Sequence, residues 1–331
     1  MRIGILSFAH LHAEGYQANL RTVPGVELVG FSHENGDEGR FFAEKYGLRW
    51  FAQHRDLLAQ GLNGVLICAE NAHHLELVEM AAEAKCQILC EKPIETNLAD
   101  ANAMESICAK NGVRFMTAFP MRFAPPAQAV RTMIRKRELG NVLGVSGINH
   151  SEIPKGHRPW FADKELAGGG AVMDHTVHLA DLLRWYFEAE VVEIYAEVDN
   201  LFYPDEVDVD TAGLILLTLA NGVQASIDCS WSRPRSYPRW GHLKMEVIGE
   251  QGTVVMDGFA QYLTLYSNRR NPSWFGFGPD PNQAMIEEFV DSIRENRKPS
   301  VTWNDGYQAL RVALAAYQSA KMKEPVRLEH P

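Results

Sequence analysis

The sequence predicts an α/β protein with a parallel, doubly wound sheet, followed by an α+β region with an open, mostly antiparallel sheet flanked by helices. In residues 1–121, short apolar runs alternate with helical patterns, which is typical of parallel strands joined by helices. In residues 122–331, consecutive β-runs are joined by turn signals such as Asn221-Gly222, which favours antiparallel pairing. We therefore expect two domains, 1–121 and 122–331.

The first region opens with an apolar strand and then alternates regularly. The predicted strands are Arg2–Ser7, Val26–Ser32, Gly64–Cys68, Gln87–Cys90 and Arg114–Thr117. The predicted helices are Ala13–Arg21, Gly39–Tyr46, His74–Ala84 and Leu98–Asn111.

The second region begins and ends with helices, and its centre is rich in strands. The predicted helices are Pro126–Arg137, Asn282–Asn296 and Gly306–Met322, with a further helix after Gly168-Gly169-Gly170. The predicted strands are Val142–His150, Val191–Val198, Thr211–Leu219, Val223–Trp231, His242–Gly249 and Gly252–Asp257. The Gly-, Pro- and Asn-rich stretch Asn268–Pro281 predicts an ordered surface loop.

Composition excludes several classes of protein. The 331 residues are 46% hydrophobic, enough for two packed domains, and carry a net charge of −10. The longest basic run is Arg135-Lys136-Arg137, so we expect no nucleic-acid and no membrane partner. The N-terminal residues lack a signal-peptide pattern, and the five cysteines form no Cys-x-x-Cys pair, which predicts free thiols in the cytoplasm.

Two motifs carry the chemistry. Glu91-Lys92-Pro93 follows an apolar run, which places the lysine at the carboxyl edge of a parallel sheet, where ligands bind in such folds. Asp174, His178 and Asp181 are spaced by four and three residues, so they share one face of a helix. A lysine, a carboxylate and an imidazole are the groups that proton transfer to and from a hydroxyl requires.

Glu91-Lys92-Pro93 and the stretch GGGAVMDHTVHLADLLRW, in this order, resemble the Gfo/Idh/MocA family of NAD(P)-dependent sugar and polyol dehydrogenases. The resemblance implies an N-terminal Rossmann domain that binds the dinucleotide and a C-terminal domain for substrate binding and oligomerisation. It also implies a cis Lys92–Pro93 bond, a small sugar or polyol substrate, and a homodimer or homotetramer formed through the C-terminal sheet.

By this resemblance, Lys92 holds the substrate oxygen, His178 is the general acid/base, and Asp174 binds a substrate hydroxyl or orients the imidazole. His175 and Arg122 are further candidates for substrate binding. Simpler alternatives remain: a surface lysine, a core histidine and a structural arginine. Thr176 stands where the family often has glycine, and predicts either a narrower pocket or an added hydroxyl there, and hence an unusual substrate. The glycine run predicts close approach of substrate, or a plain loop.

The loop after the first strand departs from the family. A dinucleotide site usually has G-x-G-x-x-G there, whereas Ser7, Ala9 and His12 replace the three glycines. We expect that the loop, with Phe8 and His10, still contacts the cofactor, because serine and histidine can donate to a phosphate. Loss of the cofactor is the alternative.

Other residues are expected beside the cofactor. Glu34 or His33, at the end of the second strand, would bind the adenine ribose, and the carboxylate favours NAD over NADP. The alternative is that His33 or Arg40 accepts the 2′-phosphate of NADP. Asn71 and His74 match a turn of the family next to the cofactor, although for His74 a purely structural role is equally compatible. Glu91 and Lys92 complete the predicted cofactor contacts.

The predicted function is oxidation of a secondary alcohol of a sugar, inositol or related polyol by NAD or NADP, or the reverse reduction. Two alternatives are a non-catalytic nucleotide or sugar sensor and a redox-assisted lyase or glycosidase that retains its cofactor. Metal ligation by His10-x-His12 or Asp174-His175 is a further alternative, but a polar pocket lining explains these residues, so no metal is predicted.

Overall fold

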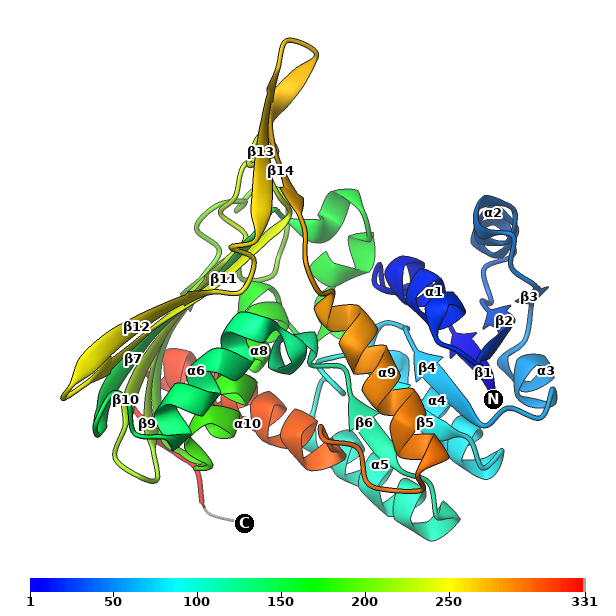
Figure 1. Cartoon of the computed structure of the whole chain (residues 1–331), viewed down its shortest axis with the longest axis horizontal. Coiled ribbons are helices and arrows are strands. Elements are labelled where there is room, and N and C mark those ends of the chain that lie inside the picture. The colour runs from blue at the N-terminus through cyan, green and yellow to red at the C-terminus, as the bar shows by residue number, and fades with distance from the viewer. Residues whose placement is uncertain (330–331) are drawn as a thin grey trace. The chain divides into compact units, whose positions relative to one another are not determined.

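The computed structural model describes residues 1–329, which divide into two compact units (Figure 1). The first unit comprises Met1–Pro120, Glu165–Gly168 and Asn282–Tyr307. The second unit comprises Met121–Lys164, Gly169–Pro281 and the chain from Gln308 onward.

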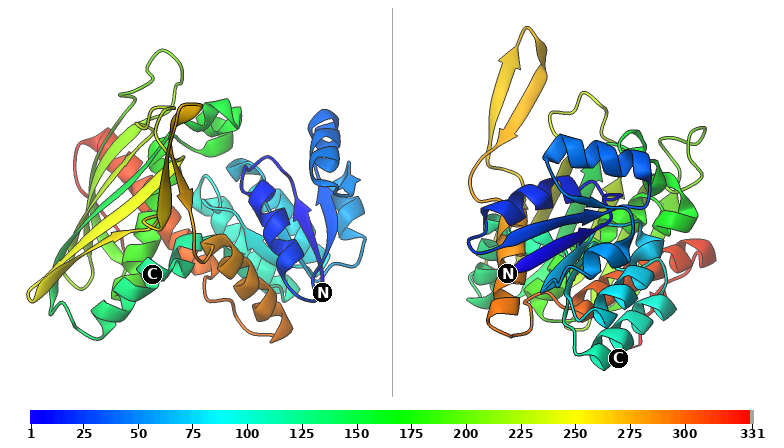
Figure 2. Two further views of the ribbon diagram at one scale, coloured as in Figure 1. Left: turned by 45° about the horizontal axis from the view of Figure 1, so that its top comes forward. Right: turned by 90° about the vertical axis from the view of Figure 1, so that its right-hand side faces the viewer.

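The first unit is built on a parallel sheet with the strand order β3-β2-β1-β4-β5-β6 and with helices on both faces (Figure 2). Its strands are β1 Arg2–Leu6, β2 Glu27–Ser32, β3 Trp50–Phe51, β4 Gly64–Ile67, β5 Gln87–Cys90 and β6 Phe115–Thr117. The strand order reverses between β1 and β4, and this switch point is where Rossmann folds bind ligands, beyond the carboxyl ends of the strands.

Capping residues determine where the helices of this unit begin and end. Asn35 caps α2 by accepting from two backbone amides, and Gly47 ends it in the left-handed conformation. Asn97 caps α5 by accepting from the Asp100 backbone amide, and Gly112 ends that helix in the left-handed conformation. The helices are α1 Ala13–Thr22, α2 Gly36–Tyr46, α3 His54–Leu58, α4 His74–Glu83, α5 Leu98–Asn111 and α9 Pro281–Arg294, with the 3₁₀ turn η1 Asn71–His73.

The second unit contains a mixed sheet in the order β12-β11-β7-β10-β9-β8-β15, in which only β7 and β10 pair in parallel. Its strands are β7 Val142–Ser151, β8 Val191–Asp199, β9 Ala212–Leu219, β10 Gln224–Ser230, β11 Gly241–Gly249, β12 Gly252–Asp257 and β15 Val326–Arg327. A separate hairpin, β13 Tyr262–Ser267 with β14 Arg270–Gly276, projects from the sheet (Figure 1).

One face of the mixed sheet is covered by helices, and α8 is its central cover because it contacts β7, β9 and β10. The helical segments of the second unit are α6 Pro125–Arg135, α8 Ala171–Phe187 and the part of α10 (Trp303–Met322) from Gln308 onward, with 3₁₀ turns η2 Pro120–Phe123, η3 Pro154–Gly156 and η4 Pro159–Ala162. The short helix α7 Lys164–Ala167 belongs, from Glu165 onward, to the first unit. Both predicted sheet classes are confirmed.

Several elements of the structure were not predicted, namely β3, α3, α7, β13, β14 and β15. β3 and α3 were not predicted, because a strand of two residues and a helix of five carry too little periodicity. The predicted loop Asn268–Pro281 is wrong in its first part, which forms β14. Aromatic pairing explains this strand, since Tyr262 stacks on Trp274 at 4.4 Å and Arg239 lies 5.0 Å from the same indole.

Two sequence predictions about the chain as a whole can be checked directly. All five cysteines are buried free thiols, as predicted. In the part of the chain that the structure describes, no helix combines the length and the apolar character needed to cross a bilayer.

Candidate active site

The turn after β1 keeps a glycine-like shape without a glycine. Ser7 has φ = 67°, in the left-handed region that glycine adopts at little cost. Phe8, the next residue, turns its ring into the core against Phe31 at 4.4 Å. The turn therefore keeps, at Ser7, a conformation that glycine favours, although the first glycine of the motif is replaced.

The amides of this loop are bonded within the protein. Phe8 N donates to His33 Nδ1 (3.3 Å), and Ala9 N donates to Ser7 Oγ (3.1 Å). His10 N donates to the Cys68 carbonyl (2.8 Å), and His12 N donates to His10 Nδ1 (3.2 Å). Amides that cradle a diphosphate in other Rossmann folds are thus already satisfied here.

The two ribose candidates at the end of β2 differ in environment. His33 is buried and accepts from Phe8 N on one nitrogen, while its Nε2 lies 2.8 Å from Glu38 Oε2. Glu34 has a largely exposed carboxylate, 4.0 Å from His54. The geometry favours Glu34 for ribose binding, since His33 joins the loop to α2.

Asn71 and His74 are both buried. The Asn71 amide donates to the Ala167 carbonyl at 2.9 Å. His74 lies 3.1 Å from the Ile94 carbonyl and 3.3 Å from the Ala69 carbonyl, and burial lowers the pKa of its imidazole. These bonds give His74 the structural role that the sequence left open.

Glu91 and Lys92 follow β5 and are only 1% and 4% exposed. The surface-lysine alternative is therefore wrong. The Lys92–Pro93 bond is cis, as the resemblance implied. Glu91 Oε2 accepts from the Lys92 backbone amide at 3.1 Å, and Glu91 Oε1 lies 2.9 Å from His12 Nδ1. The family motif and the altered glycine loop therefore meet at one edge of the sheet.

In the second unit, one stripe of α8 is accessible. Along residues 171–184 every side chain is buried except Asp174 and His178, which are partly exposed. They stand one helical turn apart, so they present a carboxylate and an imidazole on one face. This is the pair that the sequence selected for catalysis.

The neighbours of this pair point into the protein. His175 is buried, and its Nε2 lies 3.2 Å from both Asp174 Oδ2 and Ser151 Oγ, which favours orientation of the carboxylate. Thr176 is buried with its hydroxyl 3.6 Å from Cys229 Sγ on β10. The predicted narrowing of a pocket by Thr176 is therefore wrong, because the side chain packs under the helix.

Arg122 and Asp181 form a buried, bidentate ion pair. Arg122 Nε lies 2.8 Å from Asp181 Oδ2, and its second nitrogen lies 2.5 Å from Oδ1. A paired buried charge of this kind fixes one element against another and is costly to break. The contact joins η2 to α8 and favours the structural alternative for Arg122.

The glycine run makes room for protein groups. A Cβ on Gly170 would lie 1.9 Å from the Asp210 carbonyl oxygen, and a Cβ on Gly169 would lie 2.1 Å from the Tyr317 hydroxyl. The Asp210 carboxylate accepts from the amides of Gly170 and Val172, both at 2.8 Å. Asp210 and Tyr317 thus cap α8, and neither was singled out from the sequence.

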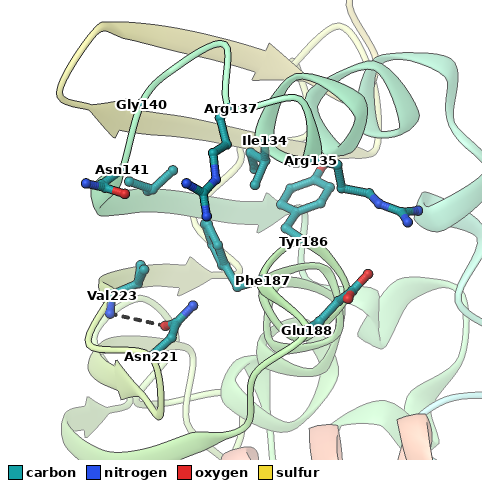
Figure 3. Close-up of a pocket in the computed structure, with 11 residues that line it drawn as sticks. Ile134, Arg135, Arg137, Gly140, Asn141, Tyr186, Phe187, Glu188, Asn221 and Val223 are labelled. Atoms are coloured by element: carbon teal, nitrogen blue, oxygen red, sulfur yellow. Dashed lines mark hydrogen bonds between the residues drawn. The ribbon is translucent and has the colours of Figure 1, made fainter.

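A shallow pocket of about 460 Å³ lies elsewhere in the second unit (Figure 3). Its lining includes Arg137, after α6, and Phe187, at the end of α8. Figure 3 shows the Arg137 side chain extending toward Phe187. Phe187 is thirteen residues from Asp174 along the helix, a separation of about 20 Å at the usual helical rise. The pocket is therefore separate from the accessible stripe of α8.

Two family models match the chain. Residues 2–119 match the oxidoreductase family with an NAD-binding Rossmann fold, and residues 127–255 match the GFO/IDH/MocA C-terminal domain. An uncharacterized oxidoreductase, YrbE, of Bacillus subtilis is 29% identical over 99% of this chain and 96% of its own length. The myo-inositol 2-dehydrogenase of Thermotoga maritima is 27% identical over 99% of both chains.

Among solved structures, GenD2 from gentamicin A biosynthesis, in complex with NAD, superposes with a TM-score of 0.89 at 23% identity. The alignment covers 100% of this chain and 97% of that one, and shows that the fold is shared. Together with the sheet order and the two matched segments, these findings confirm the family predicted from the motifs. The chain belongs to the GFO/IDH/MocA family of oxidoreductases and is an enzyme of that class.

Proposed function

We propose that this oxidoreductase transfers hydride between a nicotinamide dinucleotide and a secondary alcohol of inositol, a sugar or a related polyol. The observation that carries the proposal is the accessible Asp174–His178 stripe on α8, in a chain whose other family motif ends in the buried Lys92. Full-length relatives named as myo-inositol, scyllo-inositol and D-apiose dehydrogenases support the substrate class.

Two features of the first unit support dinucleotide binding, namely the turn after β1 and the residues that follow β2. Ser7 keeps the glycine-like conformation, and Glu34 offers an exposed carboxylate to the adenine ribose, which favours NAD. A relative named as an NADP(+)-dependent D-xylose dehydrogenase shows that both cofactors occur among similar proteins. A bound nicotinamide ring supplies the hydride acceptor or donor.

The proton is handled by the chain's own side chains. Lys92 holds the substrate oxygen, and its positive charge stabilises the alkoxide that forms as the proton leaves. His178 accepts or returns this proton, since an imidazole titrates near neutral pH. Asp174, held beside His175 Nε2 at 3.2 Å, accepts a hydrogen bond from a neighbouring substrate hydroxyl.

Lys92→Ala and His178→Ala test these roles on whichever polyol of a panel is turned over. We expect each to lower kcat by about 10²–10⁴-fold, the range for loss of a general acid or base. Lys110→Ala, on the exposed surface of α5, and the exposed His157→Gln are matched controls that should leave turnover unchanged. Near-wild-type turnover in both test variants would refute the assignment.

A second function, a sensor that binds ligand without turnover, is favoured by one observation. The four loop amides of Phe8, Ala9, His10 and His12 are bonded internally, so dinucleotide binding requires some of these bonds to exchange. A sensor predicts tight binding of a sugar or nucleotide, with no net change in dinucleotide absorbance over the whole polyol panel.

We further propose that the chain forms homo-oligomers through the uncovered face of its mixed sheet. Leu214 and Leu216, two positions apart on β9, are each more than half exposed there, and exposed apolar side chains on one face of a sheet favour an interaction surface. Sedimentation of wild type against Leu216→Glu tests the idea. A dimer or tetramer that dissociates in the variant supports it, whereas an unchanged mass contradicts it.

A further inference from the structure

Three side chains capable of binding metal meet at the carboxyl edge of the parallel sheet. His12 Nδ1 lies 2.9 Å from Glu91 Oε1, and His10 Nε2 lies 3.8 Å from Glu91 Oε2. The two imidazole rings are 4.5 Å apart between centroids. Each of the three residues offers one possible ligand atom, and these three atoms all lie within 4.8 Å of one another.

The environment of this cluster calls for positive charge. Glu91 and His10 are each 1% exposed, and a buried carboxylate is costly without compensation. Each oxygen of this carboxylate faces one imidazole nitrogen, that of His12 at 2.9 Å and that of His10 at 3.8 Å.

The donor set is that of a transition-metal centre. Two imidazoles and one carboxylate are the protein ligands of several catalytic zinc sites, which keep a fourth position for water or another oxygen. Bonds of 2.0–2.2 Å in a tetrahedron put ligand atoms about 3.4 Å apart. The two nitrogen–oxygen separations, 2.9 Å to Glu91 Oε1 and 3.8 Å to Glu91 Oε2, lie on either side of this value. Nitrogen-rich sets prefer zinc-like ions over magnesium or calcium.

We propose that His10, His12 and Glu91 bind one divalent transition-metal ion of the zinc class. His12, whose side chain is 31% exposed, gives the ion a path from solvent. Coordination through His10 Nε2 places the remaining ring proton on Nδ1, so the present bond from His12 N to His10 Nδ1 is given up. The bound ion reverses the local charge, and its open position takes an anionic oxygen.

Metal titration of the full chain tests this site without any dinucleotide, so the outcome is independent of the proposed dehydrogenase activity. Protein dialysed against chelator is titrated with Zn²⁺ by calorimetry and with Co²⁺ by visible absorption. We expect one ion per chain and the intense bands of four-coordinate Co²⁺. A stoichiometry well below one for both ions overturns the proposal.

Two variants locate the ion. His12→Gln and Glu91→Gln should each weaken Zn²⁺ binding at least tenfold, whereas His73→Gln, whose side chain is 53% exposed in the same unit, should not. His12 is partly exposed, so its variant remains folded even if the buried Glu91→Gln does not, and circular dichroism checks both. Equal affinity in wild type and His12→Gln overturns the proposal.

Discussion

The amino ends of α1 and α8 make an instructive pair. Before α1 the family's glycines are replaced, yet Ser7 keeps a glycine-like φ of 67°. Before α8 the glycines are present, yet their space is filled by the Asp210 backbone and the Tyr317 hydroxyl. In both places side chains from distant positions satisfy backbone amides.

The two helix ends differ in which groups they leave available to bind a ligand. At α8 the cap is structural, and the accessible groups, Asp174 and His178, begin one turn later. At α1 the capping bonds come from Ser7, His33 and His10 themselves, so ligand binding there must compete with them. The presence or absence of glycine therefore does not by itself identify a ligand site.

Gly170→Ala should have the largest effect on stability. The new Cβ would meet the Asp210 carbonyl oxygen at 1.9 Å, and a backbone contact cannot rotate away. We expect a loss of about 3 kcal/mol in the free energy of unfolding, measured by urea denaturation. Gly156→Ala, with nothing within 4 Å, should change it by less than about 0.5 kcal/mol. Equal stability of the two variants would remove the structural explanation of the glycine run.

Asp210→Ala should have the second-largest effect on stability. It removes the carboxylate that accepts from Gly170 N, Val172 N and the Tyr317 hydroxyl. Loss of a buried helix cap predicts a decrease of about 2 kcal/mol in unfolding free energy. The exposed Asp208→Ala is the matched control. If both variants are as stable as wild type, Asp210 does not cap α8.

Ser7→Gly and Ser7→Ala test the role of the positive φ before α1. Both remove the bond from Ala9 N to Ser7 Oγ, but only glycine relieves the positive φ. Glycine should therefore be more stable than alanine by about 1 kcal/mol. The freed Ala9 amide should also tighten dinucleotide binding in both variants. Identical stabilities would show that Ser7 is not held in the left-handed region in solution.

The smallest expected effect is a pH dependence of stability that arises from the Asp210 carboxyl group. Burial raises the pKa of this carboxyl above its usual value near 3.8, against the hydrogen bonds that it accepts. The folded chain therefore binds this proton more tightly than the unfolded chain does, so the contribution is present below about pH 3.8 and is lost as the pH rises through the raised pKa. The stability of wild type relative to Asp210→Asn should decrease over that interval. A difference that grows with pH would contradict this.

Much of the fold could be predicted from the periodicity of the sequence, whereas the candidate site could be predicted only in part. Helix Leu98–Asn111 and strand Gln87–Cys90 have the bounds predicted, because local pattern and capping agree. The caps of α8 were out of reach, because Tyr317 lies 147 positions from Gly170. The internal bonds of the loop after β1 were missed for the same reason, since His33 reaches it from the end of β2.

The most direct test is a calorimetric titration of folded protein, freed of nucleotide and metal, with NAD, NADH, NADP and NADPH. We expect micromolar binding of one oxidised and reduced pair at one per chain, with NAD and NADH preferred because of the Glu34 carboxylate. Binding of none of the four would mean that the bonds closing the Ser7–His12 loop are not exchanged for a diphosphate, and would contradict the proposed dehydrogenase activity.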